Sequence, residues 1–238
     1  MDIDKQFYRD EENFKIYLIN DFKFRNTSLD MDEFGGFASR IEQPIIPENE
    51  IWVSKYYEEK EIDLFIKNSI VQHSLMQQGL DRWAAYDESL DVEHELRVNK
   101  YNAPEYLITL AQNIPADLER EFYMEIENVK VFLVDGFQIR NYFKTDFVCG
   151  GHGYVYSWIP KDEIWLEKQS SVEELPYTLM HEFVERTLMK VNNGTYPDTH
   201  PIASKVEFSF RPDKLLKENL INLTEEETFK IINNILKT

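Results

Sequence analysis

The sequence Leu175-Pro-Tyr-Thr-Leu-Met-His-Glu-Phe-Val-Glu-Arg-Thr-Leu-Met189 has the apolar spacing of a helix that lies in a core. Residues four apart share one face of a helix, so His181 and Glu185 can bind a single ion, with Glu182 beside them. Both flanks of this face are apolar, and a charged carboxylate in such surroundings needs a partner such as a divalent cation. The stretch therefore predicts a metal site.

Two parts of the chain, about 115 residues apart, have matching sequences. Residues 15–26 match 130–141, residues 46–53 match 159–166, residues 62–76 match 175–189, Gly35-Gly36 matches Gly150-Gly151, and Glu93 and Arg97 match Glu207 and Arg211. This predicts an α+β fold made of two tandem copies of a small strand-then-helix unit, packed as an intrachain pseudo-dimer. We expect the first copy to span residues 1–125 and the second 126–238.

Other segments receive simpler interpretations. Residues 1–13 are expected to be an acidic lead-in, and Pro104 and Pro212 are each expected to open a helix. Thr224 and Glu227 have the spacing of a capping box, which predicts a docked helix at the end of the chain.

The two copies differ at the candidate ligands. His181, Glu182 and Glu185 stand opposite Asn68, Ser69 and Gln72, and in this alignment His152 stands opposite Phe37 and His200 near Asp87. The apolar residues around the helix persist in both copies, so the coordinated exchange indicates a functional unit in the second copy. Random drift of a solvent-facing patch is the alternative. Arg140, Glu163 and Trp165 have identical counterparts in the first copy, which suggests scaffold roles such as a hydrogen-bonded ion pair and core packing.

The helix resembles that of the zincin metallopeptidases, which carry His-Glu-x-x-His, although Glu185 stands here in place of the second histidine. Residues 150–207 are also similar to small uncharacterised phage and bacterial proteins. The zincin resemblance implies that His181 and Glu185 are ligands of Zn²⁺, with Mn²⁺ or Fe²⁺ as competitors. It implies that Glu182 is the catalytic base that takes a proton from metal-bound water, so that a peptide or other amide is hydrolysed.

Three residues compete for the place of the third ligand. His200 is the first choice, because it follows the main helix as the downstream ligands of zincins do. His152, at a predicted strand edge, is the second choice, and Glu207 is the third.

Composition limits the classes of partner. The 238 residues are 42% hydrophobic and 14% aromatic, which is typical of a packed globule, and the net charge of −18 disfavours nucleic acid. The single cysteine, Cys149, cannot form an internal disulfide. The first residues lack the pattern of a secretory signal and no run is long enough to span a membrane, so a cytoplasmic protein is expected.

Two other functions remain open at this point. In one alternative the protein is a non-enzymatic acidic adaptor that binds a basic protein partner. The adaptor would then contain a structural metal or no metal. An acidic decoy that mimics nucleic acid ranks last, because the acidic residues are spread along the chain.

Overall fold

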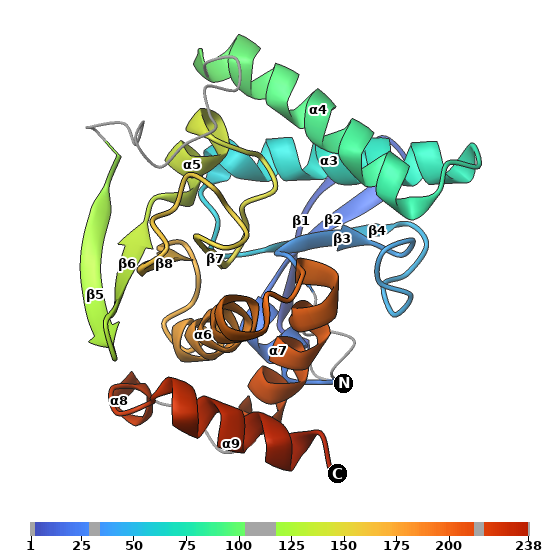
Figure 1. Ribbon diagram of the computed structural model, residues 1–238. Helices are drawn as coiled ribbons and strands as arrows, with labels where there is room; N and C mark the ends of the chain where they lie inside the picture. The colour runs from blue at the N-terminus through green and yellow to red at the C-terminus, as the bar shows by residue number, and fades with distance from the viewer. Residues whose placement is uncertain (1–2, 29–33, 103–117, 212–216, 238) are drawn as a thin grey trace.

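The computed structural model describes residues 3–28, 34–102, 118–211 and 217–237, and contains two four-stranded sheets with the same strand order (Figure 1). The first sheet has the order β1 (Lys5–Glu11), β2 (Phe14–Ile19), β4 (Glu50–Ser54) and β3 (Phe37–Ser39). The second has the order β5 (Arg120–Ile126), β6 (Val129–Val134), β8 (Glu163–Glu167) and β7 (Gly150–His152). The predicted α+β arrangement of two strand-then-helix copies is confirmed.

The duplication extends to details of each hairpin. β1 pairs with β2 and β5 with β6 in antiparallel register, and each outer strand carries an irregularity at the same place, between Phe7 and Arg9 and between Phe122 and Met124. The turns match as well, with Glu12 at φ 52° and Glu127 at φ 50°. The acidic lead-in is therefore mostly strand β1. The sheet of the second copy begins with β5 at Arg120, ahead of the expected boundary at residue 126.

The strand register changes one detail of the sequence alignment. Ser39 of β3 lies opposite Ile51 of β4, and His152 of β7 lies opposite Ile164 of β8. Because Ile51 and Ile164 are equivalent, His152 corresponds to Ser39 and not to Phe37. Matching the two Gly-Gly pairs was wrong by two residues, since β3 and β7 are short and their preceding loops differ in sequence.

Each sheet is followed by a pair of long helices. α3 (Glu59–Gln77) and α4 (Arg82–Tyr101) belong to the first copy, and α6 (Leu175–Asn192) and α7 (Tyr196–Phe210) to the second. Short helices follow the second strand of each sheet, α1 (Asp21–Arg25) and α5 (Gly136–Tyr142). α6 is buried on all sides from Leu175 to Leu188, which explains why its sequence is apolar around most of its circumference.

The chain ends in α8 (Lys217–Leu220) and α9 (Glu225–Ile235), which lie beside α6 and α7 (Figure 1). The capping box predicted at Thr224 and Glu227 is confirmed, with both reciprocal hydrogen bonds present. The helix starts expected at Pro104 and Pro212 lie outside the described residues.

Two of the identical pairs have the predicted scaffold role. Trp52 Nε1 donates to Glu50 at 2.6 Å, and Trp165 Nε1 donates to Glu163 at 2.7 Å. Each glutamate also pairs with a cation of the outer strand, Lys5 or Arg120. The same three-residue contact therefore fixes the parallel strand of both sheets.

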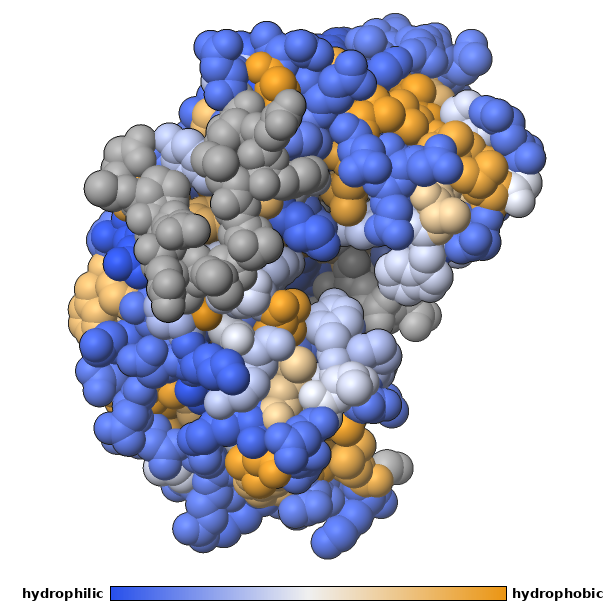
Figure 2. Space-filling model, turned by 45° about the horizontal axis from the view of Figure 1, so that its top comes forward, coloured by the Kyte–Doolittle hydropathy of each residue, from blue (hydrophilic) through white to orange (hydrophobic). Residues whose placement is uncertain are grey.

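In Figure 1, α3 and α4 lie at the top of the molecule, and α6 and α7 lie in its lower half, above α8 and α9. The surface in Figure 2 is mostly hydrophilic and is hollowed on the right of the view. Within the described ranges, no helix combines the length and apolar character needed to cross a bilayer.

Candidate metal centre

Three elements of the second copy bring the predicted site residues together. α6 supplies His181, Glu182 and Glu185, α7 supplies His200 and Glu207, and β7 ends on His152. Two groups of three have ligand atoms that all lie within 4.8 Å of one another, and both contain Glu185. One group adds His181 and His200, and the other adds His152 and Glu182.

Glycine allows β7 to approach α6 closely enough to close the site. A Cβ atom at Gly150 would lie 3.1 Å from the Thr178 side chain and 3.2 Å from that of Glu182. These distances are shorter than ordinary carbon contacts, so a larger residue would push the strand and helix apart. His152 stands two residues further along the same strand.

Two of the distances between ligand atoms in the group of His181, Glu185 and His200 match those of a tetrahedral metal shell. His181 Nε2 lies 3.1 Å from His200 Nδ1, which lies 3.2 Å from Glu185 Oε1. Zinc bonds of about 2.0 to 2.1 Å in a tetrahedron place neighbouring ligand atoms about 3.3 Å apart. The two nitrogens and one oxygen can therefore bind one zinc ion with little movement.

A carboxylate orients the first of these ligands. His181 Nδ1 donates to Glu207 Oε2 at 3.0 Å, and Arg211 holds the other Glu207 oxygen. This contact places the proton on Nδ1 and leaves the lone pair of Nε2 directed at the cluster. Glu207, the third choice for a ligand, is thus positioned behind His181, and neither group of candidate ligands includes it.

His152 is arranged as a hydrogen-bond donor. Its Nδ1 accepts the backbone N–H of Tyr154 at 3.2 Å, so in the neutral ring the proton lies on Nε2, which donates to Glu185 Oε2 at 3.2 Å. Burial lowers the pKa of His152, in spite of the nearby Glu185, and keeps the ring neutral. His152 therefore fixes Oε2 of Glu185, while Oε1 faces His200.

The two neighbouring carboxylates of α6 differ in protonation. Burial, followed by the charges of Glu185 and Glu207, raises the pKa of Glu182 well above its ordinary value. Burial acts in the same direction on Glu185, but hydrogen bonds from His152 and His200 outweigh it and lower the pKa to about 2. Glu185 is thus ionised, whereas Glu182 is favoured in its protonated form.

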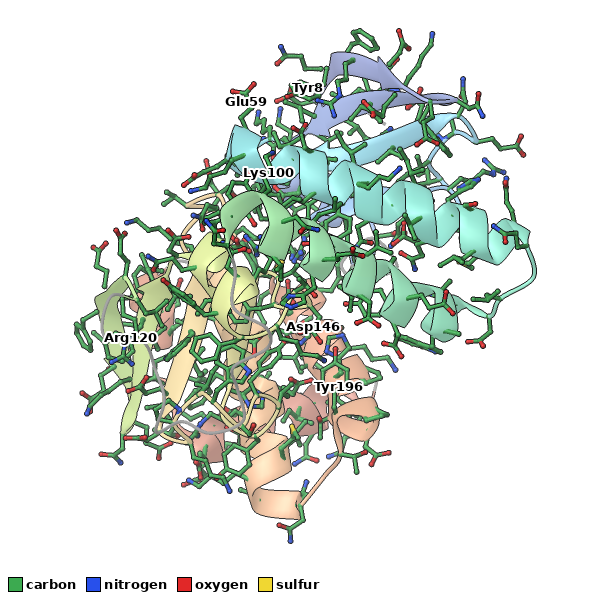
Figure 3. The ribbon with its side chains drawn as sticks, turned by 90° about the horizontal axis from the view of Figure 1, so that it is seen from above. Tyr8, Glu59, Lys100, Arg120, Asp146 and Tyr196 are labelled. Carbon is green, nitrogen blue, oxygen red and sulfur yellow. The ribbon has the colours of Figure 1, made fainter. Side chains whose placement is uncertain are left out.

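The site opens to solvent on the side of α7. His200 has 28% of its side chain exposed, whereas Glu185 has only 3%. The ring of Tyr196 stacks on His200 with centroids 4.7 Å apart, and Tyr196 is 44% exposed. Figure 3 shows Tyr196 at the start of α7. The exposed side of the cluster is therefore formed by His200 and Tyr196.

The three helix positions equivalent to His181, Glu182 and Glu185 carry neutral side chains in the first copy. Asn68, Ser69 and Gln72 are buried there, and Asn68 Nδ2 donates to Glu93 at 2.7 Å as His181 does to Glu207. In the described part of the chain, Asn68 Oδ1, Ser69 Oγ and Gln72 Oε1 have no hydrogen-bond partner. These positions are buried and do not form a solvent-facing patch, so surface drift does not explain the exchange.

Sequence reasoning gave no functional role to Arg211 or Tyr196. A signal for Arg211 was present, because Glu207 and Arg211 are four residues apart on the chain and repeat Glu93 and Arg97. No comparable pattern identifies Tyr196, since only the packing of α7 against α6 places it over His200.

Comparison with known proteins finds no matching family model, no similar curated protein and no similar solved structure. The function of this chain is therefore inferred from the geometry of its own residues.

Proposed function

We propose that the protein is a metal-dependent hydrolase of zincin-like type, with its active site in the second copy. The observation that supports this is the spacing of His181 Nε2, His200 Nδ1 and Glu185 Oε1, which suits one tetrahedral zinc ion. Three protein ligands leave a fourth position for water or substrate, which is typical of catalytic zinc.

Glu182 is the proposed general base. A bound divalent cation supplies Lewis acidity, which makes water easier to deprotonate and polarises a carbonyl group. Glu182 lies next to the ligand helix face and belongs to the buried group with His152 and Glu185. Burial, followed by the charges of Glu185 and Glu207, raises the pKa of Glu182, and a bound cation would lower it, so that Glu182 would ionise and accept a proton from the attacking water. It then returns that proton to the leaving amine.

The candidate ligands limit the choice of metal ion, and the net charge of the protein limits the choice of substrate. Two imidazoles with one carboxylate suit zinc, and the carboxylate keeps Mn²⁺ or Fe²⁺ as candidates. A peptide or other amide is the proposed substrate. Because the net charge is −18, neutral or basic substrates are favoured over acidic ones.

Metal content tests the site directly. We expect the wild type to retain about one equivalent of zinc after dialysis, and His181→Ala and Glu185→Ala to retain almost none, because each removes one of three ligands. Elemental analysis of the purified proteins measures this. Equal metal content in the wild type and in both variants would refute the site.

Loss of the base separates catalysis from binding. Glu182→Gln is expected to lower hydrolysis of a peptide-amide library by about 100- to 10,000-fold and to leave zinc content and thermal stability close to wild type. Mass spectrometry of the library measures cleavage. If Glu182→Gln lost zinc as completely as Glu185→Ala, Glu182 would be a ligand, and the proposed base would have to be another residue.

A further inference from the structure

A chain of buried ion pairs connects the first copy to the metal centre of the second. Arg25 Nη1 donates to Glu174 Oε1 at 3.2 Å, and Arg211 donates to both oxygens of Glu174 at 2.7 and 3.1 Å. Arg211 also pairs with Glu207, which accepts from His181 Nδ1 at 3.0 Å. We propose that Arg25 of the first copy is a positioning residue for His181; this inference rests on the proposed function.

An equivalent network of buried ion pairs exists in the first copy. Arg140 of the second copy donates to Glu61 at 2.8 and 2.5 Å, and Arg97 donates to Glu61 at 2.9 Å. Arg97 also bonds Glu93, which accepts from Asn68 Nδ2 at 2.7 Å. Each residue of this network has its counterpart at the equivalent position, although Arg140 also pairs with Glu167 and Arg25 also contacts Cys149. The two networks end on different groups. The network of the second copy ends on the imidazole of His181, a candidate metal ligand, and that of the first copy ends on the amide of Asn68.

Both chains cross between the copies. Arg25 ends helix α1 of the first copy and reaches Glu174 at the start of α6, and Arg140 of α5 reaches Glu61 in the first turn of α3. Arg25 is also held by the backbone oxygen of Phe34 in its own copy and by Cys149 Sγ in the other. Each copy thus fixes the long helix of its partner, as expected for the intrachain equivalent of a twofold dimer.

Burial makes this chain rigid. Arg25, Glu174 and Arg211 are almost fully excluded from solvent, and Glu207 is 3% exposed. A charge in such surroundings keeps its geometry because moving away from its partner leaves it unpaired. Groups behind a ligand histidine set its orientation, and their loss typically lowers metal affinity by about 10- to 100-fold.

This arrangement gives the first copy, which lacks the candidate metal ligands, a structural role beside the site of the second copy. Within the second copy Arg211 donates two hydrogen bonds to Glu174, and Arg25 of the first copy adds another. The second copy's own equivalent of Arg25 is Arg140, which is bound to Glu61 and Glu167. The metal centre is therefore completed by the first copy.

The test compares Arg25→Lys with Arg140→Lys in the full chain. Lysine keeps the charge but cannot reproduce the fork of guanidinium contacts. The first readout needs no metal: ¹⁵N NMR of the apo-protein, whose five histidines give a tractable spectrum. Arg25→Lys is expected to shift or broaden the imidazole signal that His181→Ala removes, whereas Arg140→Lys leaves that signal unchanged. The second readout is zinc affinity, expected to fall about tenfold in Arg25→Lys and less than twofold in Arg140→Lys.

Equal changes of the His181 signal in both variants, or no change in Arg25→Lys, would overturn the positioning role. If lysine prevents folding at either position, Arg25→Gln and Arg140→Gln form a second matched pair with the same expectations. A wild type that binds no zinc would refute the proposed hydrolase, whereas the apo spectrum still decides whether Arg25 positions His181.

Discussion

Exchanging His181, Glu182 and Glu185 for the asparagine, serine and glutamine found at the same places in the first copy is expected to abolish zinc binding and leave the protein folded. The first copy buries Asn68, Ser69 and Gln72 within an equivalent helix pair, so this fold accommodates the three neutral side chains. The exchange removes two ligands and the proposed base together, and the remaining imidazole of His200 cannot hold zinc alone.

Thermal denaturation with and without zinc measures this effect. At a free zinc concentration about 1,000 times the dissociation constant, the wild type gains about 4 kcal/mol of unfolding free energy, and the triple variant gains nothing. The control replaces Asn68, Ser69 and Gln72 by alanine, which is expected to preserve the full zinc effect. A triple variant stabilised by zinc as strongly as the wild type would show that the ion binds elsewhere.

Glu207→Gln is expected to weaken zinc binding by about 10- to 100-fold, or about 1.4 to 2.7 kcal/mol. The glutamine has the same shape but no charge, so it holds the Nδ1 proton of His181 less strongly and lowers the basicity of Nε2. Its uncharged side chain also leaves the buried guanidinium of Arg211 with one anionic partner fewer.

Glu93→Gln is the matched control, because it removes the same charge beside Arg97 and Asn68 in the first copy. Both variants are expected to lose similar unfolding free energy without metal, since each removes one anionic partner from a buried arginine in an equivalent network. Only Glu207→Gln should lose zinc affinity in a chelator competition titration. Equal losses of affinity would mean that Glu207 acts through overall stability and not through His181.

The duplicated fold was predictable because the sequence patterns that indicate it involve residues close together in the chain. The repeated strand and helix sequences, the apolar residues of α6 and the capping box at Thr224 each depend on neighbours in the chain, and the structure confirms them. Short-range sequence patterns were less informative for strands whose formation or register depends on pairing with another strand. Residues 5–11 form β1 because they pair with β2, and His152 corresponds to Ser39 because of the register of β7 on β8.

The sequence by itself determined that the chain contains two copies of one α+β unit and that the candidate ligand residues occur in only the second. It did so because helical and strand periodicities, and the comparison of one copy with the other, need no knowledge of long-range contacts. Only the tertiary structure decided the roles within the cluster: His200 beside His181, Glu207 behind His181, and His152 as a donor to Glu185. It also showed that Arg25 lies within the hydrogen-bonded network of the second copy. These contacts join α1, β7 and the consecutive helices α6 and α7, and the first two lie far from the helices in sequence.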